Sequence, residues 1–462
     1  MPFRASILEL DAVYTSVTGT SLIKTGLFTD MLKDPADTLG DPWPSSITLP
    51  ALTILQLALV DALAAVGVKP DVVVGHSAGE TAVLSASGSG SKAMAVELAI
   101  ARGRAFELVE SAGGTMAAVS CSPKAARALI DEVLAELGDA PLTVGCYNTA
   151  NAVTLSGAAT HIDAAVAKAR ARDIFARRLR TRVPVHSPLM EGCRAEFTAG
   201  VERVFARHPA RAPTVETYSA AAGAAFARAF DAAYFWDGTL GPVRFDEALE
   251  GLVAAHGGRG ATFIEIGPHP VLSGYLLDRG TAPTIACPLR RPRAPEPGVE
   301  VREFVGALGK VVAAGHNCVD FDALYAGCPG AGAGTRTKMF KYPFAMKSIP
   351  WALQSAEIVR QRQKRNGPLN YPQLVVNVQT HPGLADHVIK GEPIMPAAGY
   401  IEMACASFSV RFGWKTDVFV AIGSGVWRQR SVRRRVRCAP PLVKREAGSC
   451  TSETGWDTMD GQ

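Results

Sequence analysis

Several features that would assign a protein to a class at once are missing from this sequence of 462 residues. None of the nine cysteines forms a Cys-x-x-Cys pair and their number is odd, so we expect free buried thiols in a reducing compartment. This argues against a disulfide-stabilised fold and a zinc site, and we expect no metal. The net charge of +5 is small for this length and does not by itself indicate nucleic-acid binding.

Long apolar runs are missing as well. The first residues, MPFRASILELDAVY, contain no apolar core of the length that a signal peptide needs. The longest apolar stretch, Ala51 to Val68, is interrupted by Gln56 and Asp61 and therefore predicts a buried helix, not a membrane span. Apolar residues make up 48% and charged residues 20%, the mix of a soluble globular enzyme. We expect a cytoplasmic protein that binds neither membranes nor nucleic acid.

The residue pattern that is present indicates an α/β fold. Apolar residues recur at helical spacing between Leu52 and Val66. The run Asp71-Val-Val-Val-Gly75 that follows is short and apolar, as in a central strand buried on both faces. Residues 93–111 predict a further helix, and residues 261–266 predict another buried strand.

Between Gly114 and Val183 the pattern changes. Short β-rich pieces at 116–119, 142–146 and 152–155 alternate with helices rich in Ala, Leu and Arg. We interpret this stretch as a small α+β lobe inserted into the larger α/β body. Later changes in composition, at 290–298 and 327–334, are typical of linkers.

The segment Gly75-His-Ser-Ala-Gly79 fits the pattern Gly-x-Ser-x-Gly and lies between a predicted strand and a predicted helix. In that context the glycines allow a tight turn that exposes the hydroxyl of Ser77. The amide of Ala78, at the start of the following helix, is placed to donate to an oxyanion. The pattern predicts a nucleophilic serine, which requires a general base at neutral pH.

Two histidines are candidates for that base. His186 lies in Arg182-Val-Pro-Val-His-Ser-Pro-Leu-Met190, and His269 lies in Gly267-Pro-His-Pro270. Taken alone, either residue is more often a structural histidine than a catalyst. The order along the chain does not decide between them.

Six short segments occur in a fixed order: GHSAGE (75–80), IARGRA (100–105), GTMAAV (114–119), HSPLM (186–190), GPVRF (241–245) and IEIGPHP (264–270). In order and spacing they resemble the acyltransferase domains of polyketide synthases, most closely those of iterative, reducing synthases of fungal type. The resemblance covers roughly residues 3–290. It implies an α/β-hydrolase-like large subdomain with an inserted ferredoxin-like subdomain at about 114–182.

The resemblance implies a role for each matching residue. Ser77 would become acylated, and His186 would be its general base. Arg102 would hold the free carboxylate of a malonyl group, because a guanidinium grips a carboxylate with two hydrogen bonds. The substrate-binding site would be completed by His76, Ala78 and His269.

Members of this family transfer a malonyl-like acyl group from CoA to the phosphopantetheine thiol of an acyl carrier protein through a seryl ester. The implied partners are acyl-CoA, an acyl carrier protein domain and other domains of a polyketide synthase, with no cofactor bound to the chain. The residues before His186 are Val-Pro-Val, where the family carries His-Ala-Phe for malonyl or Tyr-Ala-Ser for methylmalonyl. The extender unit stays open, and malonyl is our preferred interpretation.

A second resemblance follows farther along the chain. His387, Gly391 and Pro396 form the pattern His-x-x-x-Gly-x-x-x-x-Pro, which is similar to the opening of a polyketide synthase dehydratase domain. The resemblance ends near Ala406, so we expect the second half of the hot-dog fold to be missing, together with the acidic partner of the histidine. Because dehydration by the usual route needs both members of that acid–base pair, we expect His387 to be inactive.

These observations predict four regions: an acyltransferase domain at 1–290, a linker at 291–370, a partial dehydratase hot-dog at 371–410 and an unassigned, basic, disordered tail at 411–462. We expect both ends to be truncated. In the family a Gly-Gln-Gly segment, whose glutamine supplies the second oxyanion-hole amide, would lie before Phe3. The loss of one such donor costs about 10²–10³ in rate in other enzymes.

Two other functions stay open at this point. An α/β-hydrolase of thioesterase type would release acyl groups to water, although Arg102 and the inserted lobe argue against it. The second is an inactive fragment of a synthase, such as a module that only docks a carrier protein. Six arginines between Arg170 and Arg182 are either a solvated face or a docking surface for an acidic carrier.

Overall fold

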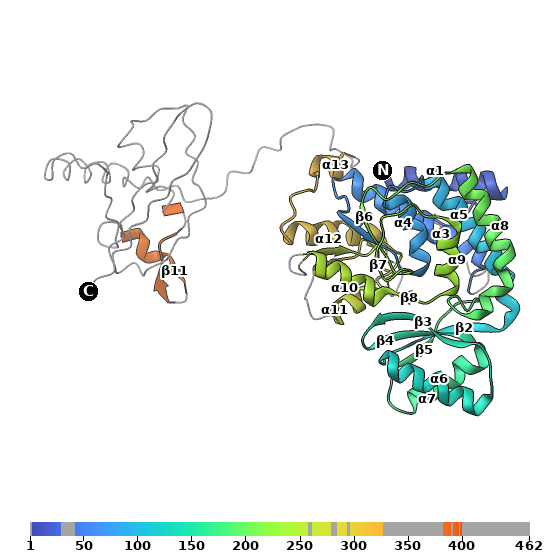
Figure 1. Cartoon of the computed structure of the whole chain (residues 1–462). Coiled ribbons are helices and arrows are strands. Elements are labelled where there is room, and N and C mark those ends of the chain that lie inside the picture. Colours follow the sequence, from blue (N-terminus) through green and yellow to red (C-terminus); the bar gives the residue numbers. More distant parts are fainter. Residues whose placement is uncertain are drawn as a thin grey trace, which may run out of the picture. The chain divides into compact units, whose positions relative to one another are not determined.

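The computed structural model describes residues 2–28, 42–256, 261–278, 284–292 and 296–326, and in addition 382–389, 391–396 and 398–399. The chain divides into two units, Met1–Thr335 and Arg336–Gln462. The first unit contains a larger body and a smaller lobe, which lies at the bottom of Figure 1.

Helix α3 (Ser45–Ala65) is a core helix of the larger body, packed against α1 (Pro2–Thr18) and α5 (Lys92–Glu107). Among the described helices, α3 is long and apolar enough to span a membrane by length and composition, yet half of its apolar segment is buried inside the molecule. The predicted buried helix is therefore confirmed, although it begins at Ser45, ahead of Leu52, and includes Pro50. Further helices of the body are α4 (Glu80–Ala86), α8 (Arg194–Arg207), α9 (Ala232–Leu240), α10 (Phe245–His256), α11 (Ser273–Asp278), α12 (Val299–Ala313) and α13 (Phe321–Tyr325).

Short parallel strand pairs lie inside the body. β1 (Val72–Val74) pairs in parallel with β6 (Glu216–Ser219), which pairs antiparallel with β7 (Ala224–Ala225). β9 (Thr262–Ile264) and β10 (Thr284–Ala286) form another parallel pair. Parallel strands need crossover connections, here through helices, so the body has the α/β character that the sequence predicts.

The smaller lobe consists of β2 (Gly114–Val119), α6 (Pro123–Leu137), β3 (Leu142–Thr149), β4 (Ala152–Ala158), α7 (Ala159–Arg170) and β5 (Ala176–Arg178). Its strands lie in the order β5-β2-β4-β3, and α6 and α7 pack together against the sheet (Figure 1). The element order β-α-β-β-α-β is that of a ferredoxin-like unit. The sheet and helices enclose a separate apolar cluster, in which Val133, Leu155 and Ile162 are fully buried.

The lobe is tied to the body by main-chain pairing as well as by the chain connections. β8 (Val243–Arg244) comes from the body and extends the lobe sheet, pairing in parallel with β3. Val243 and Phe245 are buried in one cluster with Met116 and Cys146 of the lobe. This shared cluster limits how far the lobe can move relative to the body.

The first unit continues past residue 290, where a linker was predicted to begin. α12 buries Ala307, Leu308 and Val311 against the body because these apolar residues share one helical face, which packs against β10. The rest of the predicted linker, most of the predicted hot-dog segment and the predicted tail at 411–462 lie outside the described residues.

In the second unit the structure describes a short hairpin. The 3-10 helix η4 (Pro382–Asp386) precedes β11 (Val388–Ile389), which pairs antiparallel with β12 (Glu392–Pro393). Gly391 makes the turn between the strands with a φ of +81°, a left-handed conformation that glycine adopts without strain.

Candidate active site

The Gly-x-Ser-x-Gly segment forms the turn between β1 and α4. Ser77 opens the 3-10 helix η1 (Ser77–Gly79) with a φ of +53°, which is uncommon for a residue other than glycine. A Cβ on Gly75 would lie 2.9 Å from the Cα and N atoms of Glu80, so only glycine fits where the turn closes. A strained turn between a strand and a helix is the geometry that exposes a nucleophilic serine at the edge of a sheet.

Ser77 and His186 are in direct contact: Oγ of the serine lies 2.7 Å from Nε2 of the histidine. The other ring nitrogen, Nδ1, lies 2.9 Å from the carbonyl oxygen of Gly241. A carbonyl oxygen can only accept, so Nδ1 carries the proton and Nε2 is left to accept the proton of Ser77. A main-chain carbonyl thus occupies the orienting position that an acidic side chain has in Ser-His-Asp triads.

The surroundings of His186 keep its ring neutral. The residue is 3% exposed, and its φ of +66° is fixed by hydrogen bonds: its N–H donates to the carbonyl of Thr239, and its carbonyl accepts from Oγ1 of Thr143. Burial, together with repulsion from His76 and Arg102, lowers the pKa of His186 from the usual 6.5 to about 4. At neutral pH the ring is therefore uncharged, as a general base must be.

A cavity of about 510 Å³ opens beside Ser77 and Ala78. Its walls come from the start of α3, the end of α5 and the segment that leads out of the lobe. Eight of the side chains that line it are apolar: Pro42, Trp43, Leu49, Ala78, Phe106, Met116, Val183 and Val185. Three are arginines: Arg180, Arg182 and Arg291. The cavity therefore suits a ligand with an apolar or neutral part near the serine and negative charge elsewhere.

Arg102 is 3% exposed and lies next to Phe106, one of the residues that line this cavity. Its guanidinium carbon is 5.8 Å from the centre of the Phe106 ring and 5.6 Å from that of Phe235, and Nη1 donates to Oγ1 of Thr81. Its Nε has no acceptor among the described residues. Burial lowers the pKa of Arg102 to about 10, so the side chain stays charged at neutral pH and keeps unused donor capacity.

Two buried residues coupled to Arg102, Glu80 and Tyr234, had no role predicted from the sequence. Glu80 accepts hydrogen bonds from Oη of Tyr234 at 2.8 Å and from the main-chain N–H of Ala220 at 3.0 Å. Burial raises the pKa of Glu80, while the charge of Arg102 opposes that rise. The carboxylate is thus occupied by other donors. In the sequence, the only indication of a role for Glu80 is its position as the last residue of the GHSAGE segment.

His76 links the nucleophile turn to the lobe. Its Nε2 is 2.8 Å from Oδ1 of Asn148 in β3, and its ring meets the ring of Phe245 edge-on at 5.0 Å. Burial lowers the pKa of His76. Nε2 must donate to the amide oxygen, so this residue, predicted to bind substrate, makes a structural hydrogen bond next to Ser77.

The other two residues predicted to bind substrate differ in position. Ala78 lines the cavity next to Ser77, at the second position of η1, where a helix leaves the amide N–H without an internal partner. His269 is exposed, and its Nδ1 accepts from the N–H of Arg291 at 3.2 Å. Arg291 itself lines the cavity. His269 therefore contributes to the cavity by holding Arg291.

The dehydratase-like residues lie on the hairpin of the second unit. Nδ1 of His387 is 2.7 Å from the carbonyl oxygen of Ile394, to which it donates, and the N–H of Ile394 donates to the carbonyl of His387. Gly391 makes the turn, and Pro396 follows the second strand. The spacing of His387, Gly391 and Pro396 therefore corresponds to the start, the turn and the end of one hairpin.

In the described part of the chain, no group of three His, Cys, Asp or Glu side chains could hold a metal ion. The five cysteines described there are free. Cys121, Cys146 and Cys193 are buried as predicted, whereas Cys318 is exposed.

Comparison with known families agrees with this geometry. The family described as acyl transferase domain matches residues 2–308, and that described as polyketide synthase dehydratase domain matches residues 372–429. Highly reducing polyketide synthase stpks1 of Strobilurus tenacellus is 41% identical over 408 residues, which is 87% of this chain and 14% of that protein. Highly reducing polyketide synthase 40 of Fusarium pseudograminearum is 30% identical over 76% of this chain and 15% of its own length.

Solved structures give the same result. The acyltransferase domain from the second module of the salinomycin polyketide synthase matches with a TM-score of 0.59 and 30% identity, over 72% of each chain. A loading acyltransferase from the avermectin modular polyketide synthase matches with a TM-score of 0.58 and 25% identity, over 67% of this chain and 92% of that one. The chain spans only about one seventh of its full-length relatives. The resemblance seen in the sequence is confirmed, although the matches reach residues 308 and 429, beyond the predicted ends near 290 and 406. The chain belongs to the polyketide synthase acyltransferases, with the first part of a dehydratase domain following the acyltransferase domain.

Proposed function

We propose that this chain transfers a malonyl group from CoA to the phosphopantetheine thiol of an acyl carrier protein through Ser77. The observation that carries the proposal is the 2.7 Å contact between Oγ of Ser77 and Nε2 of His186, whose proton-bearing Nδ1 faces the carbonyl of Gly241. It pairs a nucleophile with a neutral base beside a cavity that can hold a ligand.

In the first half-reaction Nε2 of His186 takes the proton of Ser77 while Oγ attacks the thioester carbonyl. The amide of Ala78 stabilises the oxyanion of the tetrahedral intermediate. When the intermediate collapses, the carbon–sulfur bond breaks and the CoA sulfur leaves with the proton from Nε2. The product is a malonyl ester on Ser77.

In the second half-reaction the carrier thiol gives its proton to Nε2 of His186 and attacks the ester carbonyl. The ester bond breaks, and the oxygen of Ser77 takes the proton back. Transfer wins over hydrolysis only if water is kept from the ester. The apolar lining of the cavity, including Phe106, Met116 and Val185, supports this requirement.

Arg102 would hold the free carboxylate of the malonyl group. Its buried Nε lacks an acceptor among the described residues, and the carboxylate of Glu80, whose charge acts on Arg102, is engaged by Tyr234 and Ala220. A buried cation with unused donors favours an anionic acyl group over a neutral one. Val183, Val185 and Phe106 line the same cavity as Ser77, and malonyl, the smaller of the two acyl groups, is our preferred extender unit.

We extend the proposal to the whole chain as follows. The acyltransferase works in the cytoplasm with a carrier domain and other synthase domains, and binds neither membranes nor nucleic acid. His387, with Gly391 and Pro396, belongs to the dehydratase part of the chain. His76 and His269 act by positioning the turn and Arg291.

The test is to follow both half-reactions by intact mass spectrometry. The chain is loaded with malonyl-CoA, freed of excess CoA ester and mixed either with a phosphopantetheinylated carrier protein or with the same carrier lacking its arm. The proposal predicts that the malonyl mass moves to the modified carrier and persists on the chain with the unmodified one. Rapid release of free malonate in both mixtures would instead indicate a thioesterase.

A further inference from the structure

The chain crosses between the body and the lobe twice, and the two crossings lie against each other. The first crossing, residues 110–114, contains the 3-10 helix η2 (Glu110–Ala112) and leads into β2. The second, residues 179–185, leads from β5 to His186. A Cβ on Gly114 would lie 2.3 Å from Cγ of Pro184, so the crossings touch with no room for a larger residue. Any change in the angle between body and lobe must move these two segments.

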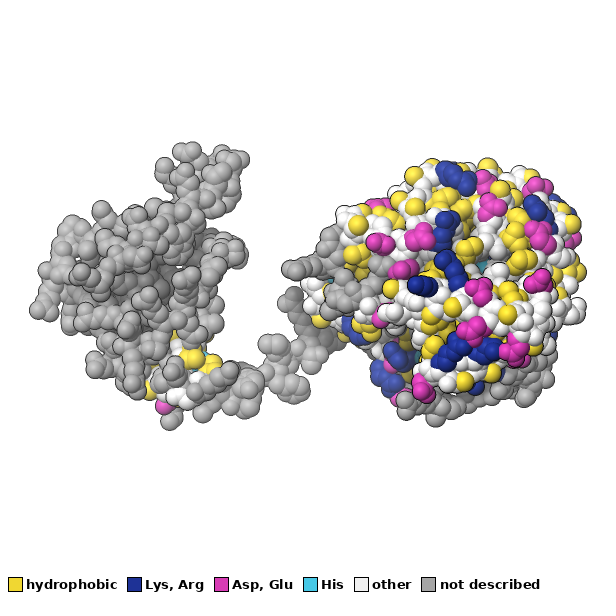
Figure 2. Space-filling view, turned by 60° about the horizontal axis from the view of Figure 1, so that its bottom comes forward, with side chains coloured by type: hydrophobic (Ala, Val, Ile, Leu, Met, Phe, Trp, Pro, Cys, Tyr) yellow, Lys and Arg dark blue, Asp and Glu magenta, His cyan; other side chains and the backbone are white. Residues whose placement is uncertain are grey.

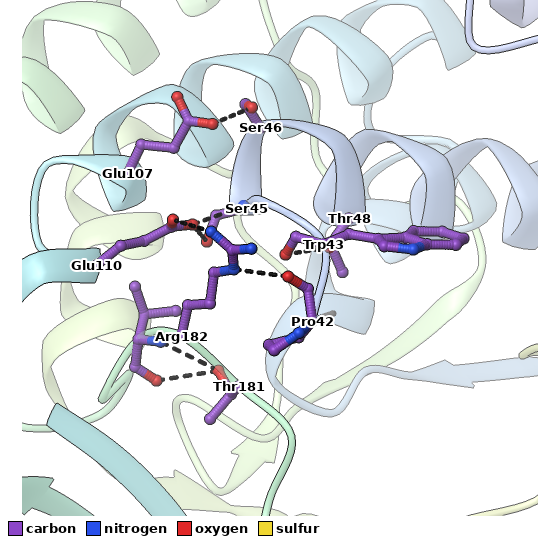
Figure 3. A network of polar contacts seen from close by, with 10 residues as sticks. Pro42, Trp43, Ser45, Ser46, Thr48, Glu107, Glu110, Thr181 and Arg182 are labelled. Atoms are coloured by element: carbon purple, nitrogen blue, oxygen red, sulfur yellow. Dashed lines mark hydrogen bonds and ion pairs between the residues drawn. The ribbon is translucent and has the colours of Figure 1, made fainter. Parts of the chain in front are cut away.

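Glu110 and Arg182 join the crossings by an ion pair. Nη1 of Arg182 donates to Oε2 of Glu110 at 3.4 Å, and Nε of Arg182 donates to the carbonyl of Pro42 at 2.6 Å. Figure 3 shows the Arg182 side chain between the Glu110 carboxylate and Pro42. The side chains are 16% and 35% exposed, so solvent screens this pair less than a surface pair.

The same carboxylate anchors the start of α3. Oε1 of Glu110 accepts from both the N–H and the hydroxyl of Ser45, each at 2.8 Å. Pro44 stands at the N-cap of α3 and has no side-chain cap to offer. A carboxylate at a helix N-terminus is favourable, so Glu110 supplies from a distant part of the sequence the cap that α3 lacks.

Two of the three segments that meet at Glu110, the start of α3 and the second crossing, also line the Ser77 cavity. Residues from the start of α3 and from the second crossing line it: Pro42, Trp43, Ser45, Thr181, Arg182 and Val183. We propose that Glu110 and Arg182 are positioning residues, whose ion pair fixes the spacing of the two crossings and thereby the width of the cavity and the approach of His186 to Ser77. We call this pair the Glu110–Arg182 latch. The pair acts through the second crossing, which continues directly into His186. This proposal depends on the proposed function only where it concerns the acyl substrate.

The latch is tested with Glu110→Gln, Arg182→Gln and the double variant of the full chain. Glu107→Gln is the matched control, because Glu107 also bonds the start of α3, through Ser46, without contacting Arg182 (Figure 3). Deuterium uptake is measured in segments 110–114 and 179–187. The rate of Ser77 modification is measured with phenylmethanesulfonyl fluoride, which needs no acyl-binding groups, and with malonyl-CoA.

We expect each latch variant to raise uptake in both crossings and to slow both modifications of Ser77 by about tenfold. The double variant should lose less than the sum of the two singles, since the shared ion pair is already lost in each of them, and the control should match the wild type. Unchanged uptake in 179–187, or effects that add in the double variant, would overturn the latch. If Arg182→Gln does not fold, Arg182→Lys, which keeps the charge but reaches one partner only, should give intermediate uptake; wild-type uptake in this variant would count against the proposal. A wild-type chain that reacts with the sulfonyl fluoride but not with malonyl-CoA would contradict the proposed function and leave the latch to be judged by the exchange data.

Discussion

Burial of His186 controls the pH range in which Ser77 can react. The lowered pKa, about 4, means that the neutral ring persists well below the usual pKa of 6.5. The rate of Ser77 acylation should therefore stay level between about pH 5 and 8 and fall only as the pH approaches 4. Stability has the matching sign: the unfolded chain binds this proton near pH 6.5 and the folded chain does not, so acidification between these values favours unfolding. Pre-steady-state loading measured across this range checks the prediction, and a fall centred near pH 6.5 would contradict it.

At Arg102 the prediction concerns discrimination between acyl groups. Arg102→Ala should slow loading from malonyl-CoA by about 10- to 100-fold, the loss expected for a charged hydrogen-bonded pair, and leave loading from acetyl-CoA nearly unchanged. Arg104→Ala is the control on the same helix, because Arg104 is exposed and bonds only the carbonyl of Val17 among the contacts described. An equal loss with both substrates would mean that Arg102 serves the fold and not the carboxylate.

Residues of the site could be predicted from the sequence where a reaction requires a recognisable sequence motif. Ser77 stands in a Gly-x-Ser-x-Gly pattern, and the structure brings it to His186, which residue patterns alone did not separate from His269. The orienting group of His186 could not be predicted, since the carbonyl of Gly241 belongs to the main chain and any residue could supply it. Tertiary contacts of this kind appear only when the chain is folded.

At the scale of the elements, the turn after β1 has no room for a side chain at Gly75. Gly75→Ala should destabilise the chain by about 1–3 kcal/mol, because the new methyl would press on the backbone of Glu80 and displace the start of α4. Gly306→Ala, in α12, is the control: nothing lies within 4 Å of the added Cβ, so stability should stay the same or rise slightly. Urea midpoints measure both, and equal midpoints for the two variants would contradict the account.

Elements with strong local signals were predicted, and long-range pairings were not. The core helix, the strand before Ser77 and the three long strands of the lobe follow from their periodicity. The pairing of β8 with β3 joins segments nearly one hundred residues apart, which no local pattern encodes. The Pro- and Arg-rich stretch at 290–298 predicts a linker, whereas the residues that follow it form the amphipathic helix α12, packed against the body.

At the scale of the whole molecule, charge determines how a carrier would approach. Basic and acidic side chains are mixed over the face in Figure 2, with a run of basic ones near its centre. Two arginines of the lobe have acidic partners: Arg172 pairs with Glu132 and Arg178 with Asp163. These exposed pairs contribute little to stability, so acidic side chains of a partner can compete for the two arginines.

The resulting prediction separates the two half-reactions. Replacing Arg177 and Arg178 by Glu should slow transfer to the carrier, more strongly at low salt, and leave loading from malonyl-CoA unchanged. Rates of both steps, measured at two ionic strengths, provide the check. A loss shared equally by both steps would indicate damage to the lobe and not a docking surface.

The central claim, that Ser77 is the acylated nucleophile, is tested most directly by the intact mass of the chain after brief exposure to malonyl-CoA, with Ser77→Ala treated in parallel. The account predicts an increase equal to one malonyl group on the wild-type chain and none on the variant. A folded wild-type chain that stays unmodified, or an adduct that persists in Ser77→Ala, would contradict it.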